Sequence, residues 1–192
     1  MKPLNQYIQE KLIINKDYKD YRNNMIVVKS FDELRNIIED RYNKLGPGTK
    51  RKPIDFNDID VSNIDSFYDK YSGGIFKGTK FKYIDVSNWD VSNVTNMTAL
   101  FYMCKDLKSV GNISEWDVSN VTDMNRMFYD CKLFNQDLSS WNVSNVTDMA
   151  QMFRGCISFN QDLSNWNVSK VIYKNGAFNN CPIKNEYKPK FK

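Results

Sequence analysis

The sequence predicts an α/β repeat protein, a solenoid of about five turns that stands behind an N-terminal α/β cap. Two observations predict this class. The string W-x-V-S-N-V-T returns along the chain at a nearly fixed interval. Within each copy the spacing of apolar residues changes from period two, typical of a strand, to a period near 3.6, typical of a helix. A catalytic motif needs to occur once, so a recurring one indicates architecture.

The first half of each copy predicts a short strand. The tryptophans Trp89, Trp116, Trp141 and Trp166 lie 27, 25 and 25 residues apart, and an earlier copy opens at Ile59. The apolar positions of each copy follow L-x-x-L-x-L-x-x, which is the spacing of a leucine-rich repeat. Because the middle of this spacing alternates, we expect parallel strands that begin near these five residues, with the indoles stacked inside.

The second half of each copy predicts a short helix. In residues 124–131 the apolar side chains fall at i, i+3, i+4 and i+7, which forms one stripe of a helix, and Thr122 stands where a helix cap is needed. Residues 97–104 and 149–156 repeat this stripe. The pattern decays in the last copy, at Ile172 and Lys174, as the end of a solenoid requires.

The residues before the repeats predict a cap. Residues 3–14 form a short amphipathic pattern, and residues 25–30, M-I-V-V-K-S, indicate a strand. A capping box at Ser30 opens a helix through about Lys44, which Gly46 and Pro47 end. We therefore divide the chain into a cap (1–54), a solenoid (55–181) and a basic C-terminal tail (182–192). Alternatively, residues 3–14 form a detachable helix that binds a partner.

The repeat resembles that of a known family. The string W-D-V-S-N-V-T-D-M-N-R-M-F-Y-D-C-K-L-F-N-Q-D-L-S-S-W, from residue 116, is similar to the repeat of the BspA-like bacterial surface proteins. The resemblance covers residues 56–181. It implies a right-handed leucine-rich-repeat solenoid that binds or adheres and is not an enzyme. Similar repeats occur in phages of low-GC bacteria, and the Asn-, Lys- and Ile-rich composition suits such a source.

The composition argues against catalysis and metal binding. The chain contains no histidine, which removes the commonest general base and metal ligand. Its four cysteines occur once in each of the last four copies, with no close C-x-x-C pair, so we predict a column of small buried residues, reduced and not a zinc site. No phosphate-binding or nucleophile motif is present. We expect no enzyme activity, no cofactor and no metal.

The exteriors of the expected strands are the predicted binding surface. Solenoids usually bind through their concave face, and the residues beside each inward valine are predicted to lie there. The first three turns of this face are acidic and the last two are neutral. We therefore expect a protein partner with a basic surface. The predicted residues are Asp58, Asp60, Ser62, Asp90, Ser92, Glu115, Asp117, Ser119, Asn142 and Ser144.

A second predicted binding element is an insertion in the first copy. This copy exceeds the 25-residue period by five residues, around K-Y-S-G-G-I-F-K-G-T-K, and insertions in repeats map to loops. If the loop projects, Tyr71, Ile75 and Phe76 become exposed anchors. For both predicted surfaces a simpler interpretation exists. The polar residues of the expected strands only solvate a tight sheet, and the five extra residues of the first copy are sequence drift beside the cap.

Charge is distributed unevenly along the chain. Residues 1–54 carry a net charge of +5, residues 55–165 carry −6 and residues 166–192 carry +5. Two further hypotheses follow: the acidic surface inhibits a nucleic-acid-binding partner, as in a phage or host-interaction protein, or the basic termini bind nucleic acid directly. We expect a cytoplasmic protein, in a host cell or virion if a phage encodes it, because no signal-like or membrane-spanning apolar run is visible.

Overall fold

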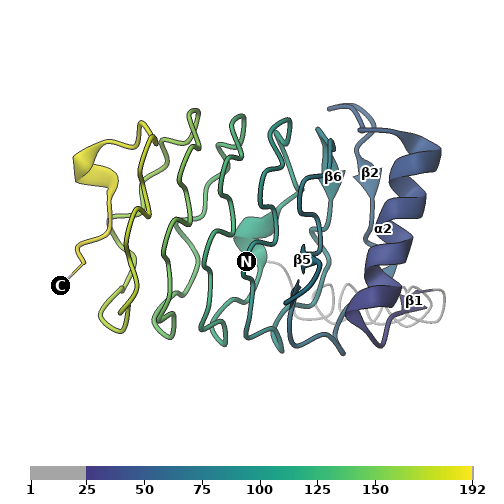
Figure 1. Ribbon diagram of the computed structural model, residues 1–192, viewed down its shortest axis with the longest axis horizontal. Helices are drawn as coiled ribbons and strands as arrows, with labels where there is room; N and C mark the ends of the chain where they lie inside the picture. Colours follow the sequence, from purple (N-terminus) through teal and green to yellow (C-terminus); the bar gives the residue numbers. More distant parts are fainter. Residues whose placement is uncertain (1–24, 192) are drawn as a thin grey trace, which may run out of the picture.

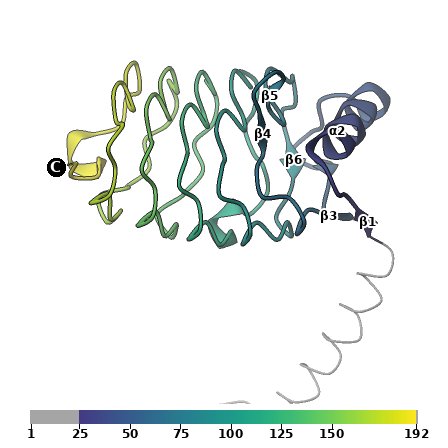
Figure 2. The ribbon, with the colours of Figure 1, turned by 60° about the horizontal axis from the view of Figure 1, so that its bottom comes forward.

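The computed structural model describes residues 25–191, which form a row of coils stacked side by side (Figure 1). The helix α2 stands at one end of the row and the C-terminal segment at the other, and a second view shows the same order (Figure 2). Backbone bridges join each coil to the next in parallel. They link Ser66 with Asn96, Asn96 with Asp123, Asp123 with Asp148, and Asp148 with Tyr173.

The N-terminal unit folds as its sequence predicts from residue 25 onward. Strand β1 (Ile26–Val27) pairs in parallel with β3 (Ile59–Asp60), and α2 spans Phe31–Leu45. The Ser30 hydroxyl accepts the N–H of Glu33 at the start of α2. At its end Gly46 adopts a φ of 72° and donates to the Tyr42 carbonyl. The predicted helix at residues 3–14 lies outside the described residues.

The remaining regular elements are short and lie mostly near this end. Strand β2 (Ile54–Asp55) pairs in parallel with β6 (Ile84–Asp85). Strands β4 (Tyr68–Asp69) and β5 (Gly73–Gly74) form an antiparallel hairpin. Two 3₁₀ turns follow, η1 (Ile113–Glu115) and η2 (Asn185–Tyr187).

The expected strands at the tryptophans are wrong. Only the first copy has one, β3 at Ile59. In the other four copies the tryptophan follows a turn and is in no strand, and the parallel bridges lie seven residues further on. The alternation in V-S-N-V comes from turns. Their valines point inward, and their polar residues make the hydrogen bonds that hold the turn. A turn of this kind buries every second or third side chain, so its pattern imitates a strand.

The expected helices in the repeats are also wrong, because α2 is the only α-helix within residues 25–191. In the second copy, Ala99 and Met103 have φ values of 54° and 59°, which no α-helix tolerates. Alternate backbone N–H groups of this segment cross to the next coil, as from Ala99 to Asn125 at 2.8 Å, while those between them bond three residues back, as from Leu100 to Met97 at 3.2 Å. Every backbone N–H group of residues 97–104 therefore has a hydrogen-bond acceptor, although the segment is not a helix.

The apolar stripes nevertheless form the core. Met97, Leu100, Phe101 and Cys104 are all fully buried. Their phenylalanine continues as a stacked column through Phe128, Phe153 and Phe178, with ring centroids 5.4, 5.5 and 5.6 Å apart. Successive turns place the same four positions inward that a helix would.

The prediction of stacked, buried tryptophans is confirmed. The four indoles are at most 5% exposed, and each neighbouring pair has its centroids 6.5 Å apart with planes within 7° of parallel. Each indole N–H donates to a carbonyl of the preceding coil, as from Trp141 to Ile113 at 2.7 Å. The stack is therefore held by both ring contact and hydrogen bonds.

The cysteines form the expected column of free thiols. Cys104, Cys131 and Cys156 are buried and Cys181 is half-buried. Each of the three buried thiols donates to a phenylalanine carbonyl of the preceding coil, at 2.8 to 2.9 Å. Burial raises the pKa of the Cys104 thiol to about 12 and that of Cys131 well above its ordinary value.

The C-terminal segment is packed and is not a frayed tail. Ile183 is 4% exposed, Phe191 lies on Phe178 with centroids 6.5 Å apart, and the Tyr187 carbonyl accepts the N–H of Leu163 at 2.8 Å. Lys184 and Lys190 of this segment are exposed, while its apolar residues cover the last coil. No helix within residues 25–191 is long and apolar enough to cross a membrane.

Candidate functional site

The polar residues predicted to bind a partner form a corner of each coil. At this corner the side-chain oxygen of Asp or Asn accepts the backbone N–H of the serine two residues later, which closes a turn. We call this set the D-x-S column. Its members and their distances to the serine N are Asp60 (2.9 Å), Asp90 (3.2 Å), Asp117 (3.0 Å), Asn142 (3.2 Å) and Asn167 (3.2 Å).

The column is in register from coil to coil. The asparagine that follows each serine donates its amide to the serine carbonyl of the preceding coil. These bonds run from Asn93 to Ser62 (3.0 Å), from Asn120 to Ser92 (2.8 Å) and from Asn145 to Ser119 (2.8 Å). The predicted residues are thus brought together along one edge of the row, with Ser144 continuing it at the next coil.

The column is acidic over its first three coils and neutral over the next two. Asp90 and Asp117 are exposed and Asp60 is half-buried. The hydroxyl and N–H of Ser119 lower the pKa of Asp117, so its carboxylate is charged at neutral pH. In the last coil Lys170 occupies the asparagine position and donates to Asn145 at 2.7 Å, which adds a positive charge at that end.

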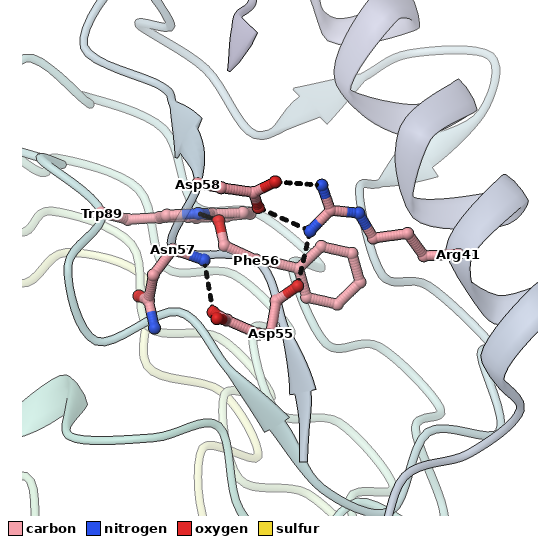
Figure 3. A network of polar contacts seen from close by, with 6 residues as sticks. All are labelled: Arg41, Asp55, Phe56, Asn57, Asp58 and Trp89. Carbon is pink, nitrogen blue, oxygen red and sulfur yellow. Dashed lines mark hydrogen bonds and ion pairs between the residues drawn. The ribbon is translucent and has the colours of Figure 1, made fainter. Parts of the chain in front are cut away.

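Two of the predicted residues lie beside the column. Glu115 is exposed in η1. Asp58 receives two hydrogen bonds from Arg41 of α2, at 2.6 and 2.7 Å, and the same guanidinium lies 5.3 Å from the Phe56 ring centroid (Figure 3). The bonds from Arg41 hold the pKa of Asp58 below its ordinary value. Asp58 therefore clamps the N-terminal unit to the first coil.

The insertion loop corrects another expectation. Tyr71 is 83% exposed, as predicted, but Ile75 and Phe76 are 2% and 1% exposed and cannot serve as surface anchors. The β4–β5 hairpin turns the chain back into the core, where Phe76 stacks on Phe101 at 5.3 Å. A Cβ at Gly74 would come within 1.9 Å of the Ala99 carbonyl oxygen, so a glycine allows this close return.

A further surface that sequence reasoning missed lies beside this loop. It combines side chains of the hairpin with Tyr102 and Arg126 from the next two coils. The signal for it lies between the apolar positions of the stripes, where a tyrosine or an arginine recurs: Tyr102, Arg126, Tyr129 and Arg154. No prediction was made for these positions, because they lie outside the apolar stripes.

Within residues 25–191 no cluster of three or more His, Cys, Asp or Glu residues could hold a metal ion. The acidic side chains of the repeats instead accept hydrogen bonds from their own turns. Asp123 and Asp148, for example, accept the N–H groups of Asn125 and Ala150 at 2.8 and 2.7 Å. Their chemistry is that of turn formation and surface charge.

Comparison with known proteins gives one match. The family model described as "Mycoplasma protein of unknown function, DUF285" matches residues 55–191, which include every coil and the packed C-terminal segment. No curated protein and no solved structure matches the chain.

Proposed function

The chain belongs to the DUF285 family of Mycoplasma proteins of unknown function, and we propose that it is a non-enzymatic binding module whose D-x-S column docks a basic surface of another protein. The row of coils then acts as a leucine-rich-repeat-like solenoid, a scaffold that holds repeated side chains in register. We place this activity in the cytoplasm. Where the partner itself binds nucleic acid, docking on the acidic coils blocks the partner's nucleic-acid-binding surface.

One observation carries the proposal: in this column asparagine and aspartate accept the same backbone N–H of the serine two residues later. Asn142 and Asn167 close the same turn with the same serine contact that Asp90 and Asp117 make. A neutral amide therefore suffices at this corner. Carboxylates at the first three coils are a surplus over what the turn requires, and a surplus of charge on an exposed edge favours a function in binding.

Electrostatics sets the expected behaviour of such a site. Like charges on neighbouring coils repel each other, so a partner that supplies cations relieves this repulsion as it binds. Charged groups at the rim of an interface act mainly on the association rate and its salt dependence. Exposed carboxylates such as those of Asp90 and Asp117 should act in this way.

The test replaces Asp90 and Asp117 together by Asn. A matched control replaces Asp137 and Asp162 by Asn, because these exposed residues close equivalent turns with Ser139 and Ser164 at 2.8 and 2.9 Å, away from the column. Both variants lose two charges and should keep their urea midpoint. Partners recovered with the wild-type protein are purified, and their binding kinetics are measured at several salt concentrations.

We expect the Asp90/Asp117 variant to associate about tenfold more slowly, with a weaker dependence on salt, while the control variant behaves as wild type. Equal effects of the two variants would show that net charge alone matters. Unchanged association in both would remove the column as the binding site.

A further inference from the structure

A depression on a different part of the surface has the composition of a ligand site. It has a volume of about 240 Å³ and lies between the insertion hairpin and the next two coils. Three lysine or arginine residues and three tyrosines line it, and none of its nine lining residues that the structure describes is acidic. They are Tyr68, Lys70, Tyr71, Gly73, Lys77, Thr98, Ala99, Tyr102 and Arg126.

The hairpin side of the depression is held in shape by Asp69. Its carboxylate accepts the N–H groups of Tyr71 and Ser72 at 2.9 and 2.8 Å, and the Ser72 hydroxyl at 3.0 Å. These bonds engage the one carboxylate of the hairpin inside the loop. They also present Lys70 and Tyr71 together, with the ammonium group 4.6 Å from the ring centroid.

One residue that lines the depression, Thr98, carries an unsatisfied polar group. Thr98 Oγ1 is buried and has no hydrogen-bond partner among residues 25–191. A buried hydroxyl without a partner is unfavourable, and such groups are rare in folded proteins. A bound group that offers a donor or acceptor at this position removes that deficit.

The coil side supplies an oriented cation and a stacking surface. Arg126 donates from Nε to Gln151 at 2.9 Å, which fixes the guanidinium plane and leaves its two terminal nitrogens for a ligand. The Tyr102 ring stacks on Tyr129 with centroids 4.9 Å apart, and Arg154 lies 5.6 Å from the Tyr129 centroid. Aromatic rings and cations thus continue from the depression along the coils.

We propose that this surface, which we call the tyrosine groove, binds single-stranded nucleic acid. A base stacks on the ring of Tyr102, which lines the depression and is half-buried, because each aromatic ring can accept any base. The guanidinium of Arg126 matches a phosphate with two parallel N–H donors, and Lys70 and Lys77 add charge along the backbone. Cations alone would suit an acidic peptide equally well; the three tyrosines favour a ligand with planar rings.

The experiment uses the full chain and fluorescently labelled oligo(dT) and oligo(dA) of twelve nucleotides, with anisotropy measured at 50 and 200 mM salt. Wild type should bind both oligonucleotides, with an affinity that falls steeply as salt rises. Tyr102→Ala and Arg126→Gln should each weaken binding about tenfold, whereas Tyr102→Phe, which keeps the ring, should bind as wild type.

A matched control removes an exposed aromatic and an exposed cation from the last coil, by Tyr173→Ala with Lys170→Ala. It should bind as wild type, and so should the Asp90/Asp117 variant, which separates this site from the acidic column. If Tyr102→Ala lowers the urea midpoint, Lys77→Ala replaces it in the test, because Lys77 is exposed.

Three results would overturn the proposal. The first is that neither oligonucleotide binds. The second is that polyglutamate or heparin competes as strongly as oligo(dT) while Tyr102→Ala has no effect, which makes the groove a plain cationic patch. The third is that the last-coil control weakens binding as much as the groove variants do, which places the nucleic acid on the basic C-terminal end.

Discussion

Replacement of Trp141 by Ala tests how the coils are held together. This indole is 3% exposed and lies between Trp116 and Trp166, with both centroids 6.5 Å away. Its N–H donates to the Ile113 carbonyl at 2.7 Å. The substitution therefore empties one place in a continuous stack and removes one of the two hydrogen bonds that the Ile113 carbonyl accepts, the other coming from the backbone N–H of Trp116 at 3.2 Å.

The expected cost follows from these contacts. A buried tryptophan removes roughly 200 Å² of surface from water, which at about 25 cal/mol per Å² is about 5 kcal/mol. Partial burial in the unfolded chain lowers this figure, while loss of the indole hydrogen bond raises it by about 1 kcal/mol. We expect a loss of about 4 kcal/mol in the free energy of unfolding, within the range known for such substitutions.

The assay is urea unfolding followed by circular dichroism, with Trp166→Ala as the matched control. Trp166 has one indole neighbour instead of two and donates a similar bond to the Leu138 carbonyl, so its loss should cost about 1–2 kcal/mol less. A loss below about 1 kcal/mol for Trp141→Ala would refute the reasoning, and so would an equal or larger loss for Trp166→Ala.

Two more predictions concern ionisation. The pKa of Asp58 is lowered from 3.8 by Arg41, so the pair contributes stability above about pH 3.8 that is lost as pH falls through the lowered pKa. Asp58→Asn should therefore cost about 1–2 kcal/mol in urea unfolding at pH 7 and less at pH 3; an equal cost at both pH values would contradict this. Burial raises the pKa of all four cysteine thiols. Cys104, Cys131 and Cys156 are buried, whereas Cys181 is half-buried. A thiol reagent should therefore label one site slowly and the other three only in denaturant, and rapid native labelling of several thiols would count against the buried column.

The core was readable from the sequence because its residues recur. Trp116, Val118, Val121 and Met124 were assigned inward, as were their equivalents in the second and fourth copies, and all of these residues are buried. Burial depends on which side chains are apolar and how often they return, and both are visible in the string. The helix at residues 31–45 was readable for another local reason, since Ser30 and Gly46 mark its two ends.

The backbone conformation of the repeats was not readable in the same way. Thr122 was interpreted as a helix cap, but its hydroxyl donates to the Thr95 carbonyl of the preceding coil at 3.2 Å. An i, i+3, i+4, i+7 stripe fits both a helix and a series of turns. The choice between them depends on whether alternate N–H groups find acceptors on the next coil, and those acceptors exist only after the coils have stacked.

The sequence by itself thus determined the period, the buried columns and the polar corner of each coil, because each of these repeats along the chain and needs no distant partner. Only the tertiary structure decided that Ile75 and Phe76 turn inward, that Arg41 engages Asp58, and that Tyr102 and Arg126 meet the insertion hairpin. These contacts join residues of different copies or different elements. They depend on which coil edges face one another, and a linear pattern does not contain that geometry.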